Sequence, residues 1–480
     1  MGRPGQPDVL LVVADALRAA NLGCYGYGRD TSPNIDRLAA GGRVFAHAFA
    51  PNPPTEPSFT SMLSGLGAPS HGVFAMMAGA RPPSSMDSLP RAMARAGYRT
   101  VIVSVLKGWI SEQFEITVDS TYTRRIPFAW RKAEYTTTRA LTALRELDND
   151  QPLFMLVHYL DSHTPYLPPP PYDRLFYPGE PGREFDPVPN PLGPRLARSP
   201  VALYHRAWIG FAADPDWVVA QYDGAIRYLD SWLQVLFDAF QARAGGDGLV
   251  VLTADHGEVL LEDDESMFEH IGLRDPVLRI PLIVAGRGVP RDRVDATVVN
   301  SQVAHTLIGA AGAAWGDGIG RSGHDLLADR VQGAGVFLAT YATRYFELAA
   351  HAGDRALVQR LSERGDVRAE RLVTANGGTA EGFAARSSEG DLVAPLRAVL
   401  EETEQLRSAM TSQRSALAGT EGHRLFEAWR WSKPEGAAVV AARLARLGYE
   451  EEGPVVVDAE GNVKNELLRW RDIAEELSPE

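Results

Sequence analysis

At 480 residues the chain is long enough for one large α/β domain and a smaller one, with a substantial buried core. Its hydrophobic content of 45% and charged content of 23% are ordinary for a globular protein and exclude a disordered or fibrous chain. The formal net charge of -13 argues against a nucleic-acid-binding protein, because binding a phosphate backbone requires a basic surface.

The first predicted element is a strand over residues 8–13, DVLLVV, a short apolar run of the kind that is buried on both faces of a sheet. Asp15 interrupts this run, so the start of the chain lacks the uninterrupted apolar region of a signal peptide. No stretch approaches the roughly 20 apolar residues that a membrane span requires. These features predict a cytoplasmic protein without a membrane span. The single cysteine, Cys24, also excludes an intramolecular disulfide and a thiolate metal cluster.

Helices and strands alternate through the next part of the chain. A helix begins at Ser32-Pro33 and ends at a glycine pair, as helix-capping preferences predict. Further strands are predicted over residues 99–105, 152–160, 248–254 and 279–285, and further helices over 86–97, 133–147 and 217–240. The last helix has one apolar face, formed by Tyr222, Ile226, Leu229, Leu233, Leu236 and Phe240. This alternation predicts a three-layer α/β/α sandwich around a large, mostly parallel sheet, with ligands beyond the carboxyl ends of the strands.

Composition divides the chain into a large domain over residues 1–330 and a smaller C-terminal α+β subdomain over 331–480. The subdomain is predicted to be mostly helical and to end in a hairpin turned at Glu460-Gly461. Within the large domain, residues 167–196 are Pro-rich, aperiodic and too long for a plain connection. This segment is either a surface excursion or a lid over the functional site.

Chemically versatile side chains gather beside the predicted element ends, at Asp15, Thr55, Asp161, His163, Asp255 and His256. Carboxylate oxygens and imidazole nitrogens that converge from several strand ends are the ligands of a hard or borderline cation. The hydroxyl of Thr55 would complete a tetrahedral set and lose its proton more easily beside the cation, which makes it a candidate nucleophile. The helix predicted to start there would favour a bound phosphate or sulfate.

Each of these signals has a structural alternative. Asp15 could simply cap a helix, the Asp-His-Gly sequence at 255–257 could be a turn, and His163 could be a packed histidine. Ser58 is a rival nucleophile, although helix capping is the commoner role of such a serine. The joint occurrence of the candidates at strand ends is what favours a metal site.

Five segments together resemble the sulfatase family of the alkaline phosphatase superfamily. They are VLLVVADALR…LGCYGYGRDTSPNIDRLAAGG, HYLDSHTPY, QYDGAIRYLDSWL, TADHGE and LRIPLIV, and the similarity extends over residues 8–330. The resemblance implies the α/β fold of that family and a metal-dependent ester hydrolase or transferase. It places Cys24 in a structural turn of the family and not at the nucleophile.

The sequence departs from the sulfatase pattern at the nucleophile. Sulfatases carry C/S-x-P-x-R, whose Cys or Ser becomes formylglycine, whereas this chain reads Thr55-Glu56-Pro57-Ser58-Phe59. Threonine cannot be oxidised to that aldehyde, and Ala16 replaces the second of two paired aspartates. Thr nucleophiles are typical of the nucleotide pyrophosphatase/phosphodiesterases and the phosphoethanolamine transferases. The resemblance therefore implies phosphoester chemistry through a covalent intermediate on Thr55.

The transferase pattern implies one divalent cation, with zinc preferred over manganese or calcium, held by Asp15, Thr55, Asp255 and His256. The expected substrate is a small or lipid-like phosphoester, either a monoester or a diester. Two other functions stay open: a sulfoester hydrolase that works without formylglycine, and a catalytically degenerate binding protein.

The same resemblance implies roles for four residues around the cation. His163 and His270 would protonate the leaving group, and Asp161 would bind substrate or join these histidines in holding a second zinc. Lys107 either reaches the substrate, as sulfatase lysines do, or is solvated. His71 and His158 flank these motifs and either orient ligands or pack.

Overall fold

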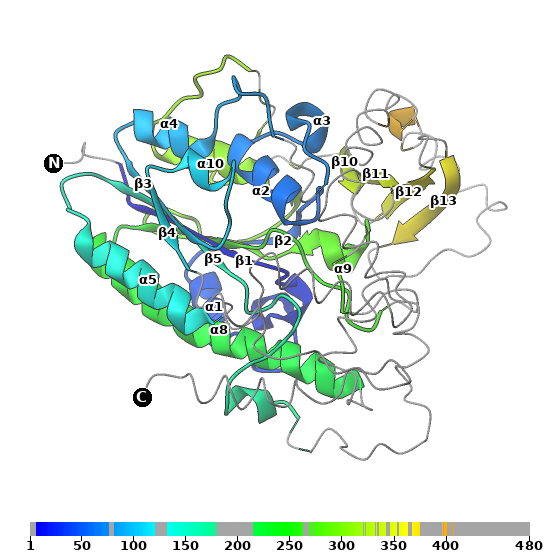
Figure 1. Cartoon of the computed structure of the whole chain (residues 1–480), viewed down its shortest axis with the longest axis horizontal. Helices are drawn as coiled ribbons and strands as arrows, with labels where there is room; N and C mark the ends of the chain where they lie inside the picture. Colours follow the sequence, from blue (N-terminus) through cyan, green and yellow to red (C-terminus); the bar gives the residue numbers. More distant parts are fainter. Residues whose placement is uncertain are drawn as a thin grey trace, which may run out of the picture.

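The computed structural model describes residues 6–75, 81–120, 132–177, 179, 215–262, 268–270, 272–319, 321, 323–331, 333, 336–341, 346–352, 355–362, 367–374, 396, 398–400 and 407. A large sheet lies in the middle of the molecule with helices on both of its faces, and a second sheet lies at one end (Figure 1). The predicted three-layer α/β/α fold with a smaller C-terminal region is therefore confirmed.

Within the described part of the chain, nine strands form the large sheet, in the order β4-β3-β5-β1-β6-β8-β2-β7, with β9 paired to β2. Their bounds are β1 Val9–Ala14, β2 Arg43–Phe49, β3 Arg99–Ser104, β4 Ile116–Asp119, β5 Leu153–Tyr159, β6 Leu249–Thr253, β7 Arg279–Ile280, β8 Leu282–Ala285 and β9 Arg293–Val299. Strand β1 pairs in parallel with both β5 and β6, and every one of its residues is buried. Its uninterrupted apolar sequence is explained by this central position, where both faces are covered.

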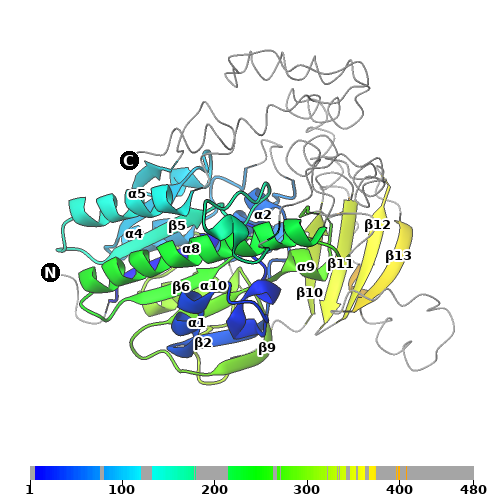
Figure 2. The ribbon, with the colours of Figure 1, turned by 90° about the horizontal axis from the view of Figure 1, so that it is seen from below.

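The helices are α1 Pro33–Ala40, α2 Thr55–Ser64, α3 Ala68–His71, α4 Leu89–Arg95, α5 Ala133–Glu146, α8 Pro215–Arg243, α9 Asp275–Leu278 and α10 Gln302–Ala310. Helices α1, α5 and α8 cover one face of the sheet, and α2, α4 and α10 cover the other (Figures 1 and 2). The predicted apolar face of α8 is fully buried, from Tyr222 to Phe240. Its 3.6-residue periodicity therefore identified the side that packs on the sheet.

The smaller sheet is antiparallel, in the order β10 (Val336–Tyr341), β11 (Phe346–Ala352), β12 (Arg355–Leu361) and β13 (Val367–Thr374). The expectation of mostly helical structure was wrong for this stretch. Its Ala-, Leu-, Glu- and Arg-rich sequence has high helix propensity, which tertiary pairing overrides. The predicted hairpin at Glu460-Gly461 lies outside the described residues, and the domain boundary at residue 330 stays a prediction.

Hydrogen bonds join this smaller sheet to two loops of the large domain. The backbone N–H of Thr340 donates to Pro51 O at 3.0 Å, and the Asn52 side chain donates to the Thr340 hydroxyl at 2.9 Å. The buried carboxylate of Glu347 on β11 accepts a hydrogen bond from Leu273 N at 2.9 Å. The smaller sheet thus holds the loop before α2 and the loop before α9.

The described beginning of the Pro-rich segment packs on α8. Asp173 O accepts a hydrogen bond from Gln221 at 2.7 Å, and the rings of Tyr172 and Tyr228 meet edge to face. Gly224 is required here, because a Cβ at this position would lie 2.4 Å from Tyr172 O. Most of the segment beyond residue 177 lies outside the described residues, so a lid stays a prediction. No helix in the described part of the chain is long and apolar enough to cross a bilayer.

A buried histidine supports the inner side of α2. Val73 N donates to His71 Nδ1 at 3.1 Å, so the proton of the neutral ring is on Nε2, which lies 2.8 Å from the Ser61 hydroxyl. Ser61 in turn donates to Asn52 Oδ1 at 3.0 Å. Burial lowers the pKa of His71 to about 3, below its ordinary value of 6.5.

This depressed pKa predicts acid destabilisation. The unfolded chain takes up a proton on His71 below pH 6.5 and the folded chain does so only near pH 3, so stability is complete above pH 6.5 and falls between these values. We expect His71 to lower the free energy of unfolding by about 1.4 kcal/mol for each pH unit within this range. Denaturant unfolding of His71→Gln across this pH range should show a shallower loss than the native chain. Equal slopes for the two proteins would contradict the assignment.

Candidate functional site

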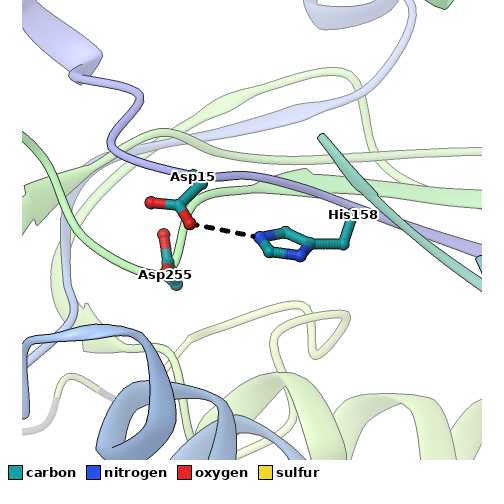
Figure 3. A group of neighbouring side chains, drawn as sticks. All are labelled: Asp15, His158 and Asp255. Atoms are coloured by element: carbon teal, nitrogen blue, oxygen red, sulfur yellow. Dashed lines mark ion pairs between the residues drawn. The ribbon is translucent and has the colours of Figure 1, made fainter. Parts of the chain in front are cut away.

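The candidate site lies at the carboxyl ends of adjacent strands in the middle of the large sheet. Asp15 follows β1, His158 is near the end of β5, and Asp255 and His256 follow β6. Asp15 N donates to Tyr159 O at 2.8 Å, which extends the β1–β5 pairing by one residue and sets Asp15 beside His158. Figure 3 shows the two aspartates and His158 facing one another. All of these side chains are buried.

Among the four predicted metal ligands, His256 lies close to each of the other three. His256 Nε2 lies 3.4 Å from Asp15 Oδ1, 3.5 Å from Asp255 Oδ2 and 3.5 Å from Thr55 Oγ1. Ligand atoms that are each about 2.0–2.1 Å from a tetrahedral zinc ion are roughly 3.3 Å apart. The observed separations therefore match the spacing that a small divalent cation needs.

The electrostatics of the site also fit a cation. Within the described residues, Asp15 Oδ1 and Asp255 Oδ2 are buried without a hydrogen-bond partner. Burial, followed by the charge of Asp15, raises the pKa of Asp255. Burial alone would raise the pKa of Asp15 as well, but three nearby imidazoles, led by that of His163, lower it below its ordinary value. Two buried carboxylates side by side are costly unless positive charge compensates them.

Backbone contacts fix the tautomer of His256. Its Nδ1 lies 2.9 Å from Gly257 O, which can only accept, so Nδ1 carries the proton. The lone pair is therefore on Nε2, the atom that faces the two aspartates. Hydrogen bonding at the other ring nitrogen is the usual way in which proteins orient a metal-binding histidine.

Thr55 was predicted just before a helix start; it is itself the first residue of α2, and only 4% of it is exposed. The positive end of the helix dipole lies here and favours a bound anion. Ser58, the rival nucleophile, is fully buried; its hydroxyl donates to Asp255 O and accepts from the Asn300 side chain at 2.8 Å. The structure thus gives Ser58 the role of joining α2 to the loop after β6.

The two predicted proton donors lie beside this centre. The His270 ring is stacked on that of His256, with centroids 4.5 Å apart, and is 4.7 Å from that of His163. His163 Nδ1 lies 2.7 Å from Thr164 O, so Nδ1 carries a proton. His270 Nδ1 lies 3.5 Å from a carboxylate oxygen of the buried Glu258. Three imidazoles from separate segments therefore meet at one place.

A profile of the Sulfatase family matches residues 7–313, which is more than half of the chain. The chain belongs to the sulfatase family. The predicted relationship to the sulfatase-like enzymes is thereby confirmed, together with membership of a family of ester hydrolases.

Similarity to individual curated proteins is more local. N-acetylgalactosamine-6-sulfatase of Homo sapiens is 33% identical over 113 residues, covering 21% of this chain and 22% of that protein. Arylsulfatase A of Homo sapiens is 36% identical over 101 residues, covering 20% of this chain and 19% of that protein. The aligned part thus spans about a fifth of the length of these relatives.

Similarity to solved structures extends over most of the fold. A protein in complex with its substrate D-glucosamine-2-N,6-O-disulfate has a TM-score of 0.66 at 16% identity, over 84% of this chain and 98% of that one. Phosphonate monoester hydrolase of Agrobacterium radiobacter has a TM-score of 0.62 at 17% identity, over 84% and 96%. At these identities the likeness establishes the fold alone.

The two predicted substrate-binding residues of this sulfatase-family chain make structural contacts. Asp161 Oδ1 accepts a hydrogen bond at 2.9 Å from Ala133 N, the first residue of α5, and so caps that helix. The ammonium group of Lys107 lies 2.6 Å from the Asp119 carboxylate, and the lysine side chain is 59% exposed. Their part in substrate binding stays a prediction.

His158 is the site residue whose role the sequence left undecided. Its Nε2 lies 3.4 Å from Asp15 Oδ2, and the ring of Phe59 packs against it edge to face with centroids 4.9 Å apart. The available signal was a histidine inside the apolar run 152–160, because a polar group buried in a strand needs a partner.

The glycine after His256 is required by the geometry of the loop. Gly257 N donates to Val277 O at 2.6 Å, and a Cβ at this position would lie 2.1 Å from Pro276 O. The carbonyl oxygens of Pro276 and Val277 are backbone atoms and cannot swing away as a side chain could. Gly257→Ala should therefore displace His256 and reduce the affinity for zinc at least tenfold, measured by isothermal titration calorimetry. Gly309→Ala is the matched control, since a Cβ there meets nothing within 4 Å. Equal affinities for the two variants would contradict this reading.

Proposed function

We propose that this sulfatase-family chain is a metal-dependent hydrolase or transferase of phosphoesters that works through a covalent intermediate on Thr55. The main support is the position of Thr55 Oγ1, 3.5 Å from His256 Nε2, at the point where Asp15 and Asp255 also meet and where α2 begins. A nucleophile, a set of cation ligands and an anion-binding helix end coincide there.

The proposed cation is divalent, with zinc preferred, and Asp15, Asp255, His256 and Thr55 would hold it. When bound, it supplies a Lewis acid that favours the ionised threonine hydroxyl and offsets negative charge on the substrate. Manganese and calcium are the alternatives.

In the first step, the Thr55 oxygen attacks phosphorus in line with the leaving alcohol. The new O–P bond forms as the ester P–O bond breaks, and His163 or His270 gives the departing oxygen a proton. The positive end of the α2 dipole stabilises the charge on the non-bridging oxygens. In the second step, water or another alcohol attacks the phosphothreonine and gives its proton to the same histidine, which regenerates Thr55.

The unmodified threonine favours a phosphoester over a sulfoester. An aldehyde-derived nucleophile can release its group by elimination, whereas a threonine ester needs a second displacement at the central atom. Displacement of this kind is the ordinary course of phosphoryl transfer.

The test is a set of assays on the metal-stripped protein after addition of zinc, manganese or calcium. The substrates are p-nitrophenyl phosphate, bis(p-nitrophenyl) phosphate and p-nitrophenyl sulfate. We expect a phosphate ester to be turned over fastest and mass spectrometry of the quenched protein to show phosphate on the peptide that contains Thr55. Faster turnover of the sulfate would support the sulfoester hydrolase instead. Absence of both turnover and stoichiometric metal would indicate a degenerate binding protein.

A further inference from the structure

His158 completes a second group of potential ligand atoms at the site. One atom each from Asp15, His158 and Asp255 lies within 4.8 Å of the other two (Figure 3). All three side chains are almost completely buried. Within the described residues, His158 Nε2 has no hydrogen-bond partner, like Asp15 Oδ1 and Asp255 Oδ2. Their contacts between imidazole nitrogen and carboxylate oxygen, at 3.4 and 3.5 Å, are longer than ordinary hydrogen bonds, and a cation between them would satisfy these buried atoms.

The ring of His158 is held in an orientation that suits a ligand. Its Nδ1 lies 3.0 Å from the hydroxyl of Ser104 at the end of β3, and that hydroxyl also accepts a hydrogen bond from Leu106 N at 3.0 Å. In one tautomer the Nδ1–H donates a hydrogen bond to the Ser104 hydroxyl oxygen, and the lone pair is then on Nε2. The Phe59 ring covers one side of the imidazole. Support on the outer nitrogen with the inner one directed at carboxylates is typical of a metal-binding histidine.

The residue after Asp15 supplies no second carboxylate. Ala16, directly after Asp15, is buried in the left-handed region at φ 59°, and its N–H lies 3.3 Å from Asp255 Oδ1. Its methyl side chain supplies no ligand, so the loop after β1 contributes Asp15 alone. An additional donor has to come from another strand, and β5 places His158 beside Asp15.

We infer that His158 is a direct ligand of the cation, in addition to the set that the sequence predicted. Two imidazoles with two carboxylates form a donor set that prefers zinc over calcium, which is bound almost entirely by oxygen. The inference rests on the proposed function only in assuming that a cation binds at this centre. Ligation by His158 would explain why the site selects zinc over calcium, a selectivity that the proposed reaction by itself does not explain.

The deciding experiment counts nitrogen ligands without reference to turnover. X-ray absorption at the zinc edge of the zinc-loaded native protein should show two imidazoles, and the spectrum of His158→Gln should show one. A single imidazole in the native protein would mean that His158 only supports Asp15, and it would overturn the inference. If the variant fails to fold, a single imidazole in the native spectrum would still overturn the inference.

Calorimetric titration of the metal-free proteins gives a second readout. His158→Gln should bind zinc at least tenfold more weakly than the native chain and bind calcium with nearly the same affinity. His71→Gln, which alters a buried histidine on the inner side of α2, should leave both affinities unchanged. Unchanged zinc affinity in His158→Gln would refute direct ligation. Loss of activity with two imidazoles still present would instead count against the proposed reaction.

Discussion

Thr55→Ala is expected to lower kcat/KM on the preferred phosphoester by about a thousandfold or more, because removing a covalent nucleophile typically costs that much. The variant should still bind zinc, since Asp15, Asp255 and His256 remain. It should also keep its fold, because Thr55 is a first-turn residue whose side chain faces His256. Steady-state kinetics, together with calorimetric zinc titration, would separate loss of chemistry from loss of the metal.

Two matched variants make this prediction specific. Thr55→Ser keeps a hydroxyl at the same place and should retain measurable turnover and a phosphorylated peptide. Ser58→Ala removes the rival hydroxyl, which joins Asp255 to Asn300; it should reduce stability but leave phosphorylation on Thr55. Full zinc-dependent turnover by Thr55→Ala would eliminate Thr55 as the nucleophile.

Asp255→Asn should have opposite effects on the metal-free and metal-loaded protein. Without metal, the buried charges of Asp15 and Asp255 repel, so removing one should leave the free energy of unfolding equal or higher. With zinc at about a thousand times its Kd, the native chain gains about 4 kcal/mol by mass action, and the variant loses most of that gain. Thermal or denaturant unfolding across a zinc series, with a chelated reference, measures both effects.

Asp223→Asn is the matched control for this measurement. Asp223 is equally buried, but on α8, where Asn21, Tyr27 and Arg29 all donate to it. Its replacement should lower stability by the same amount with and without zinc. If Asp255→Asn behaved in the same way, the carboxylate would have a purely structural role.

The central sheet and the closeness of the candidate metal ligands were predictable because both follow from local sequence. Strand β1 is a continuous apolar run that Asp15 ends, and parallel strands carry such end residues to one edge of the sheet. Strand β9 was not predicted, because it alternates exposed and partly buried residues with several charges. Strand β2 was not predicted either, because it begins with a charged residue, Arg43. This arginine is buried in an ion pair with Asp292, which the sequence does not reveal.

The role of a polar side chain could not be derived from the sequence where it depends on a contact with a residue far away in the chain. Asp161 and Lys107 fall close to strand ends, as the site residues do, but α5 and Asp119 supply their partners. His158 lies within an apolar strand, and its importance depends on β1 being the neighbour of β5. Pairing between strands far apart in sequence decided each of these cases.

The attachment of the smaller sheet limits how the chain can be shortened. Thr340 is hydrogen-bonded to the loop that leads into α2, and Glu347 is hydrogen-bonded to the loop between His270 and α9. A truncated protein that ended before β10 would lose the hydrogen bonds to both loops, although every predicted metal ligand would still be present. Exchange of the carboxyl-terminal region between relatives should therefore alter reactivity even where the reacting groups are identical.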